Sequence, residues 1–318
     1  MVVILLTNII VVVAGPTATG KTKLGIELAR HYGGEIVSAD SMQVYRRMDI
    51  GTAKATPDER SAAVHHMIDV AEPDDNYSVA RYVEEARDRV DDILARRKLP
   101  VIVGGTGLYI DSLISGRDFA ENDGDTGLRE GLLAEYDAVG GEAMLNKLRA
   151  FDPERAEKLA PGDKRRIVRA IEIYTLTGKT ITQHDIETQS IPPRYRAARI
   201  VLNYADRADL YARINGRVDE MVRKGLFDEV EGLIASGISE NCTSMQAIGY
   251  KEPAMALRGE ISREEAVELI KMSSRRYAKR QLTWFGKWTD ALRIDWQDAP
   301  NIENARQLST AFIDRFGV

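Results

Sequence analysis

The stretch GPTATGKT at residues 15–22 follows directly on the apolar run IIVVVA at residues 9–14. It fits the P-loop pattern G-x-x-x-x-G-K-[ST], and it lies between an apolar run and a region of helical periodicity, as this loop requires. Backbone N–H groups of such a loop hold a phosphate, a lysine adds positive charge, and a hydroxyl can bind Mg²⁺. The alternative is a chance glycine turn. We predict a phosphate site made of Gly15, Pro16, Thr17, Ala18, Thr19, Gly20, Lys21 and Thr22, with Thr22 as the metal ligand.

Around this loop, short apolar runs alternate with helical periodicity. We predict strands at about 8–14, 35–39 and 100–104, and helices at about 21–31 and 78–97. Such a βαβ series favours a parallel sheet flanked by helices, with ligands at the carboxyl ends of the strands. The predicted fold class is α/β.

A second region interrupts this pattern. From 117 to 191 the β-rich runs give way to helical periods, and the prolines at 192–193 block helix continuation. A further strand at 198–204 and long helices to about 288 follow. We therefore expect a P-loop core in two parts, 1–116 and 192–318, the second with basic C-terminal helices, and a helical insertion at 117–191.

Composition and charge limit the cellular location and the binding partners that can be expected. One cysteine among 318 residues excludes an internal disulfide and a cysteine-rich zinc cluster, so a cytoplasmic location is expected. The apolar N-terminus is too short to span a bilayer and lacks a basic leader, so we expect no membrane association. A net charge of -5 means that a nucleic acid must be met by local basic patches.

The residues needed to activate a γ-phosphate are incomplete. The strand at 100–104 ends in Gly-Gly-Thr-Gly rather than in the carboxylate that holds Mg²⁺ in ordinary P-loop NTPases. A carboxylate, Asp40, instead follows the strand at 35–39. Asp40 could bind metal, accept a proton from a nucleophile, or only cap a helix. Thr106 should lie at the same edge, where its hydroxyl could orient a reacting amine.

Basic residues gather in three places, at 163–169, 194–199 and 271–287. In the last cluster, Tyr277 and Trp284 are interleaved with cations, which favours an RNA partner. The alternative is a solvated helix face with its aromatic residues in the core. The pair His65 and His66 lacks further ligands at suitable spacing, and we predict a structural role for it.

Several stretches together resemble the tRNA dimethylallyltransferases, also called tRNA isopentenyltransferases. These stretches are GPTATGKT, DSMQVYR, IGTAK, HHMIDV with YSVARY, IVGGTGLY, DKRRIVRAIEIY, YARINGRVDEM, QAIGYKE and RRYAKRQLTWF, spread over residues 13–285. The resemblance implies a P-loop core whose helical insertion embraces the anticodon arm of tRNA.

The resemblance also implies the reaction. Dimethylallyl diphosphate places its diphosphate in the P-loop with Mg²⁺, and the N6 amine of the adenosine next to the anticodon, position 37, attacks the allylic carbon. Pyrophosphate leaves and nothing is hydrolysed. Asp40 is implied as the base, Thr106 as a contact to the same nucleotide, and Arg217 as a diphosphate ligand. The implied tRNA contacts are Asp40, Ser41, Met42, Gln43, Thr106, Arg129, Arg165, Arg166, Ile167, Val168 and Arg169, and a monomer is expected.

The sequence departs from the family pattern at four places. The polar stretch before Arg129 is offset by about a residue from the expected spacing, and there are three other differences. Arg165 stands where the family usually has glutamine, Gly286-Lys287 stands where an arginine follows TWF, and residues 1–6 precede the usual start. Three alternatives stay open: a prenyltransferase acting on free AMP or ATP, a small-molecule P-loop kinase, and a non-catalytic RNA-binding protein with a vestigial P-loop.

Overall fold

The computed structural model describes residues 8–115, 126–189 and 191–318. The chain divides into two compact units, one comprising Met1–Ile114 with Arg194–Val318 and the other Ser115–Pro193. Residues 1–6 and most of the predicted junction before the insertion lie outside the described residues.

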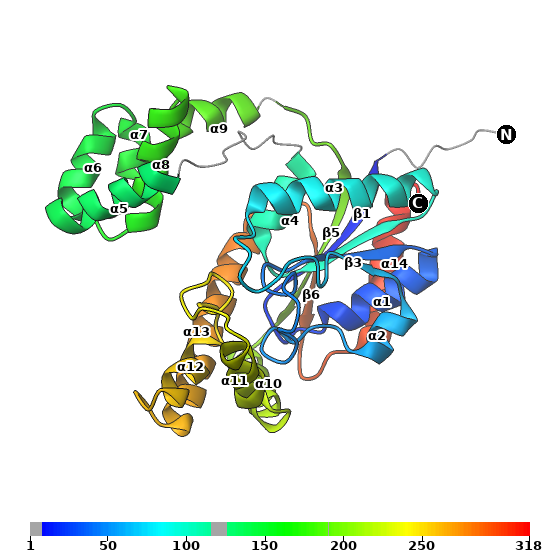
Figure 1. The fold of residues 1–318 in the computed structure, drawn as a ribbon. Coiled ribbons are helices and arrows are strands. Elements are labelled where there is room, and N and C mark those ends of the chain that lie inside the picture. The colour runs from blue at the N-terminus through cyan, green and yellow to red at the C-terminus, as the bar shows by residue number, and fades with distance from the viewer. Residues whose placement is uncertain (1–7, 116–125, 190) are drawn as a thin grey trace. The chain divides into compact units, whose positions relative to one another are not determined.

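The first unit is built on a six-stranded sheet in the order β3-β2-β4-β1-β5-β6 (Figure 1). All neighbouring strands are parallel, which confirms the predicted fold class. The strands are β1 Ile9–Ala14, β2 Glu35–Ala39, β3 His65–His66, β4 Pro100–Gly104, β5 Arg196–Tyr204 and β6 Leu292–Trp296.

The edge strands β3 and β6 were not predicted from the sequence. β3 has only two residues, and β6, with the sequence LRIDW, alternates in burial because one of its faces is exposed. β6 nevertheless contributes to the P-loop, because the indole of Trp296 donates a hydrogen bond of 3.0 Å to the Thr19 carbonyl.

Helices cover both faces of the sheet because the central strands are apolar on both faces and need shielding from water. β1 is buried at every position. On one face, α1 (Lys21–Tyr32) and α14 (Ile302–Ile313) pack on the strands and on each other, and the short α2 (Pro57–Ala62) lies against α1. Figure 1 shows α3 (Val79–Ala95) and α4 (Gly107–Ser115) on the other face, and the chain ends in η1 (Asp314–Phe316).

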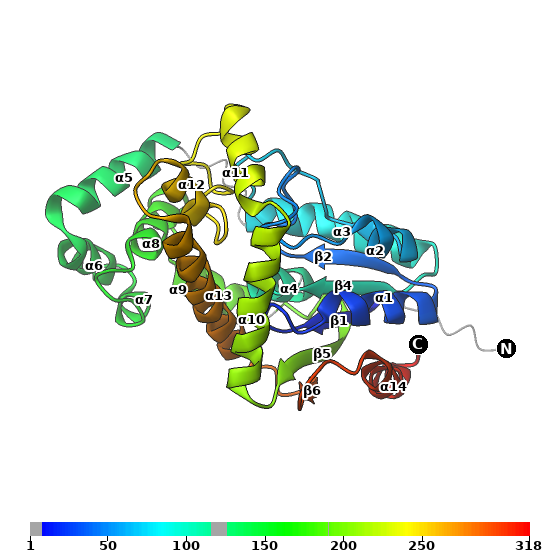
Figure 2. The same cartoon turned by 90° about the horizontal axis from the view of Figure 1, so that it is seen from below.

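A group of helices gathers at the carboxyl ends of the strands (Figure 2). They are α10 (Arg207–Arg223), α11 (Leu226–Ala235), α12 (Lys251–Leu257) and α13 (Arg263–Phe285). Across the residues that the structure covers, none of the helices combines the length and apolar character that crossing a bilayer would take.

The second unit is helical. It contains α5 (Thr126–Val139), α6 (Gly141–Arg149), α7 (Pro153–Glu157), α8 (Lys164–Thr177) and α9 (Ile181–Gln189). Its core is formed by one face of α8 packed against α5 and α6, and it includes Leu132, Leu145, Leu148, Ile167 and Ile171.

Candidate functional site

Three strands end in the same row at the carboxyl edge of the sheet. Ala14 of β1 and Ala39 of β2 both pair with Gly104 of β4, which lies between them. The P-loop, Asp40 and the segment that carries Thr106 therefore leave the sheet at one level. β1 lies inside the sheet, between β4 and β5. In open α/β sheets, ligands bind at the carboxyl ends of such strands.

The P-loop has a fixed shape. Gly15 has a φ of 144°, and a Cβ atom at this position would lie 2.3 Å from the Leu202 carbonyl oxygen, so only glycine fits. The Pro16 carbonyl accepts hydrogen bonds from the Lys21 ammonium at 2.7 Å and from the Thr19 hydroxyl at 2.8 Å. These bonds hold the loop closed around the N-terminus of α1, with its backbone in place to bind an anion.

Two cations adjoin the P-loop. Burial and, to a lesser extent, the Arg217 charge lower the pKa of Lys21 to about 7, against the opposing effect of the Asp40 charge. Burial also lowers the pKa of Arg217, again with Asp40 opposing. Arg217 comes from α10 and donates a 3.5 Å hydrogen bond to the Ala53 carbonyl. A half-buried pair of like charges favours binding of a multivalent anion such as a diphosphate.

Asp40 caps the turn that follows β2. Its Oδ1 accepts hydrogen bonds from the backbone N–H of Met42 at 2.9 Å and of Gln43 at 3.4 Å. The Thr106 hydroxyl accepts a 3.1 Å bond from the Ser41 N–H. Asp40 and Thr106 are therefore brought together. The structure shows a capping role for Asp40, and the same carboxylate lies near enough to Lys21 for its charge to affect that group.

Gln281 of α13 joins the P-loop to the end of β4. Its side-chain oxygen accepts a 3.2 Å bond from the Thr17 N–H, and its side-chain nitrogen donates a 2.8 Å bond to the Gly105 carbonyl. A Cβ atom on Gly105 would lie 2.2 Å from this nitrogen. Sequence reasoning missed Gln281. The available signal was a polar residue one turn beyond Tyr277 on the face of α13 that turns inward.

Several tyrosine hydroxyls lie near enough to the Asp40 carboxylate for its charge to affect them. The Tyr82 and Tyr109 rings stack with centroids 4.0 Å apart. Burial raises the pKa of both, and it raises the pKa of Tyr277 to about 12, with the Asp40 charge adding to the shift each time. These hydroxyls stay protonated and neutral, so the site combines an apolar aromatic wall with one nearby carboxylate.

The described residues offer few groups that could hold a metal ion. They contain no cluster of three or more His, Cys, Asp or Glu side chains that could hold an ion. Thr22 lines a cavity of about 20 Å³ together with Ser38 and Gln43. Mg²⁺ commonly binds through one or two protein oxygens, substrate phosphates and waters, which fits this donor set. His66 bonds instead to Glu35 at 2.7 Å.

Comparison with known proteins identifies the chain's family. A family model described as IPP transferase matches residues 43–288, and one described as Isopentenyl transferase matches residues 8–72. The chain is 48% identical over 277 residues to a tRNA dimethylallyltransferase of Thermoanaerobacter sp. (strain X514), covering 87% of this chain and 88% of the relative. The chain belongs to the tRNA dimethylallyltransferase family. It is a prenyl-transferring enzyme.

Solved structures agree with this family. The full-length tRNA isopentenylpyrophosphate transferase from Bacillus halodurans matches with a TM-score of 0.71 and 40% identity, over 97% of each chain. A eukaryotic dimethylallyltransferase described as acting on tRNA matches with a TM-score of 0.80 and 29% identity, over 97% of this chain and 80% of that chain.

In the present chain, the arginines predicted to bind tRNA from the helical unit differ in their surroundings. Arg129 pairs with the fully buried Glu172 through two bonds of 2.9 Å, and Arg169 adds a third of 2.8 Å. Burial alone would raise the pKa of Glu172, but these bonds outweigh it and lower the pKa. Arg165 and Arg166 are exposed at the start of α8.

Two members of the predicted tRNA-binding segment face inward. Ile167 and Val168 are 0% and 2% exposed and belong to the core of the helical unit. Their side chains pack in this core because the helical period that exposes Arg165 and Arg166 turns the next two positions toward α5 and α6, and their contact with tRNA stays a prediction. Sequence reasoning had treated the whole segment as one contact surface.

The other two basic clusters also separate. In the boundary cluster, Arg194 pairs with Asp91 at 2.6 Å and Arg199 with Asp290 at 2.9 Å, so these two arginines tie loops to the core. On α13, by contrast, the cations of residues 276, 279 and 280 are exposed.

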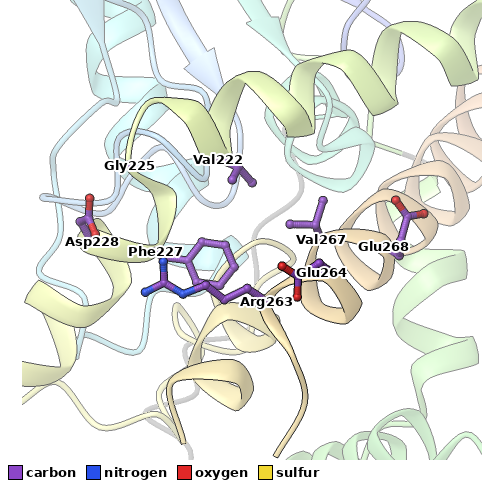
Figure 3. Close-up of a pocket in the computed structure, with 8 residues that line it drawn as sticks. All are labelled: Val222, Gly225, Phe227, Asp228, Arg263, Glu264, Val267 and Glu268. Carbon is purple, nitrogen blue, oxygen red and sulfur yellow. The ribbon is translucent and has the colours of Figure 1, made fainter. Parts of the chain in front are cut away.

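A surface hollow of about 430 Å³ lies elsewhere, between α10, α11 and α13 (Figure 3). Val222, Phe227 and Val267 form its apolar part, and Asp228 and Glu264 add acidic groups. None of the predicted site residues is among the eight that line it, so it is separate from the P-loop edge.

Proposed function

We propose that the chain transfers the dimethylallyl group from dimethylallyl diphosphate to N6 of the adenosine adjacent to the anticodon, position 37, in tRNA, with release of diphosphate. The supporting observation is the shared strand edge, where the P-loop and Asp40 leave β1 and β2 in register with β4.

The leaving group would bind at the P-loop. Loop N–H groups and the Lys21 and Arg217 cations would stabilise the negative charge that develops on the diphosphate as the allylic C–O bond breaks. A Mg²⁺ ion, when bound, supplies further charge neutralisation, and the Thr22 hydroxyl would hold it. The electron pair of the broken bond stays on the diphosphate, so no phosphate bond is cleaved.

The nucleophile would lie beside Asp40. An adenine amine is weakly nucleophilic because its lone pair is delocalised into the ring, so removal of a proton during attack assists the reaction. Both backbone bonds to Asp40 go to Oδ1, and Oδ2 would take the proton as the new C–N bond forms. Thr106, whose hydroxyl accepts a hydrogen bond from the Ser41 N–H, would hold the adenine in place. A positioned general base contributes about 10²- to 10⁴-fold.

The target adenosine must leave the anticodon-loop stack to reach this edge, at a cost of a few kcal/mol, about the usual value for flipping a base. Phosphate contacts would offset that cost. Exposure favours Arg165 and Arg166 for this role, together with the exposed cations of α13. Arg129 and Arg169 would contribute from their pairing with Glu172.

The test is transfer of label from dimethylallyl diphosphate in the presence of Mg²⁺, with unmodified tRNA, AMP or ATP offered as acceptors. We expect label on tRNA and release of pyrophosphate, and Asp40→Ala should lower the rate about 10²- to 10⁴-fold with little change in folding. Label on AMP alone, or phosphate transfer from ATP, would reject the proposal.

A further inference from the structure

The loop at residues 49–53 is held by a single carboxylate from another part of the chain. We infer that Glu229 of α11 is a positioning residue for prenyl transfer, acting through this loop on the side chains of Gln43 and Arg217. The inference rests on the proposed function and deepens it. Glu229 does not touch the predicted substrate groups, and the sequence motifs alone gave it no role.

The Glu229 carboxylate accepts four hydrogen bonds, which are shared between its two oxygens. Its Oε2 accepts hydrogen bonds from the backbone N–H of Asp49 at 2.9 Å and of Ile50 at 2.8 Å. Its Oε1 accepts one from the Gly51 N–H at 3.1 Å and one from the Tyr250 hydroxyl at 2.6 Å. Three successive backbone donors that converge on one anion fix a loop in the way that an anion fixes a backbone nest.

Tyr250 closes the other side of this arrangement. Its ring is fully buried and lies against Gly51, where a Cβ atom would be 2.5 Å from a ring carbon. Burial and the Glu229 charge keep the pKa of Tyr250 well above its ordinary value, so the hydroxyl remains a donor. The two motifs IGTAK and QAIGYKE, far apart in sequence, therefore meet at Glu229.

The loop is hydrogen-bonded in turn to the side chains of two predicted site residues. The Thr52 and Ala53 carbonyls accept hydrogen bonds from the Gln43 side-chain amide at 3.3 and 3.4 Å, and Ala53 also accepts the 3.5 Å bond from Arg217. With the loop fixed, the side chains of Gln43, a predicted tRNA contact, and Arg217, a predicted diphosphate ligand, are held in place. A loop free to shift would misplace both groups at once.

The experiment compares Glu229→Gln with Glu231→Gln, a matched change at an exposed position on the same helix. Glu229→Gln keeps the side-chain volume and replaces one acceptor oxygen by a donor. We expect kcat/KM for tRNA prenylation to fall about 10- to 100-fold, the usual cost of a displacement near 1 Å in a catalytic group. Hydrogen exchange of the amides at 49–51 should accelerate, and Glu231→Gln should change neither quantity.

Tyr250→Phe gives a second, milder variant, because it removes one of the four donors and keeps the buried ring. Its kcat/KM should lie between those of wild type and Glu229→Gln. If Glu229→Gln does not fold, the kcat/KM and the amide exchange of Tyr250→Phe test the inference in its place. Unchanged exchange at 49–51, or a kcat/KM within twofold of wild type in the folded variants, would overturn the inference. A wild-type protein that prenylates no acceptor would refute the proposed function, while the exchange data would still show whether Glu229 holds the loop.

Discussion

The pKa of Lys21 makes diphosphate binding depend on pH in a predictable direction. Burial and the Arg217 charge lower this pKa to about 7 in the ligand-free protein, so the ammonium loses its proton within the physiological range. A bound diphosphate places negative charge beside the group and should return its pKa to about 10 or above, its ordinary range. Binding above pH 7 must then be coupled to uptake of a proton.

The size of the effect follows from this difference. Affinity should fall about tenfold for each pH unit between 7 and 10, so that at pH 8.5 it is about 30-fold below the value at low pH. The stability of the ligand-free protein should depend on pH in the opposite direction. In this window the unfolded chain binds one more proton than the folded chain at Lys21, so this group's contribution to stability rises with pH.

Titration calorimetry of Mg²⁺-pyrophosphate at pH 6.5 and 8.5, in buffers of different ionisation enthalpy, measures the proton uptake. The control is Lys21→Arg, whose guanidinium stays charged throughout. Protonation of pyrophosphate itself is common to both proteins and cancels in the difference. We expect close to one additional proton for wild type at pH 8.5. Equal uptake by the two proteins, or the same pH dependence of affinity, would refute the reasoning.

Three further changes test other parts of the structure. Gly105→Ala should displace the Gln281 amide and cost about 1–3 kcal/mol in thermal unfolding, with reduced transfer; an unchanged melting temperature would argue against the contact. Glu172→Ala should destabilise the helical unit by about 2 kcal/mol in denaturant unfolding, since its arginine partners are partly exposed and can turn to water. Replacing Arg165 and Arg166 by alanine should reduce the slope of log K for tRNA against log salt by about 1–2, and an unchanged slope would exclude them as phosphate contacts.

The parts of the site that depend on local sequence were predictable. The P-loop and the ends of β1, β2 and β4 follow from apolar runs and glycines, and parallel strands in one sheet bring Asp40 and Thr106 to one edge. The contacts across long sequence separations were not predictable. Gln281 and Glu229 act through a few hydrogen bonds to groups far away in the sequence, and no local periodicity shows which distant backbone group they will meet.

The position of Gln281 also gives a physical reason why this P-loop lacks the carboxylate after β4. The first residue beyond that strand is Gly105, and even a Cβ atom there would lie 2.2 Å from the Gln281 amide nitrogen. An aspartate there would push the Gln281 side chain aside and weaken its bonds to Gly105 and to the P-loop at Thr17. The same amide that fixes the phosphate loop therefore disfavours a side chain at this position, including the carboxylate that would hold Mg²⁺ for attack on a γ-phosphate. Binding without hydrolysis is what a departing diphosphate requires.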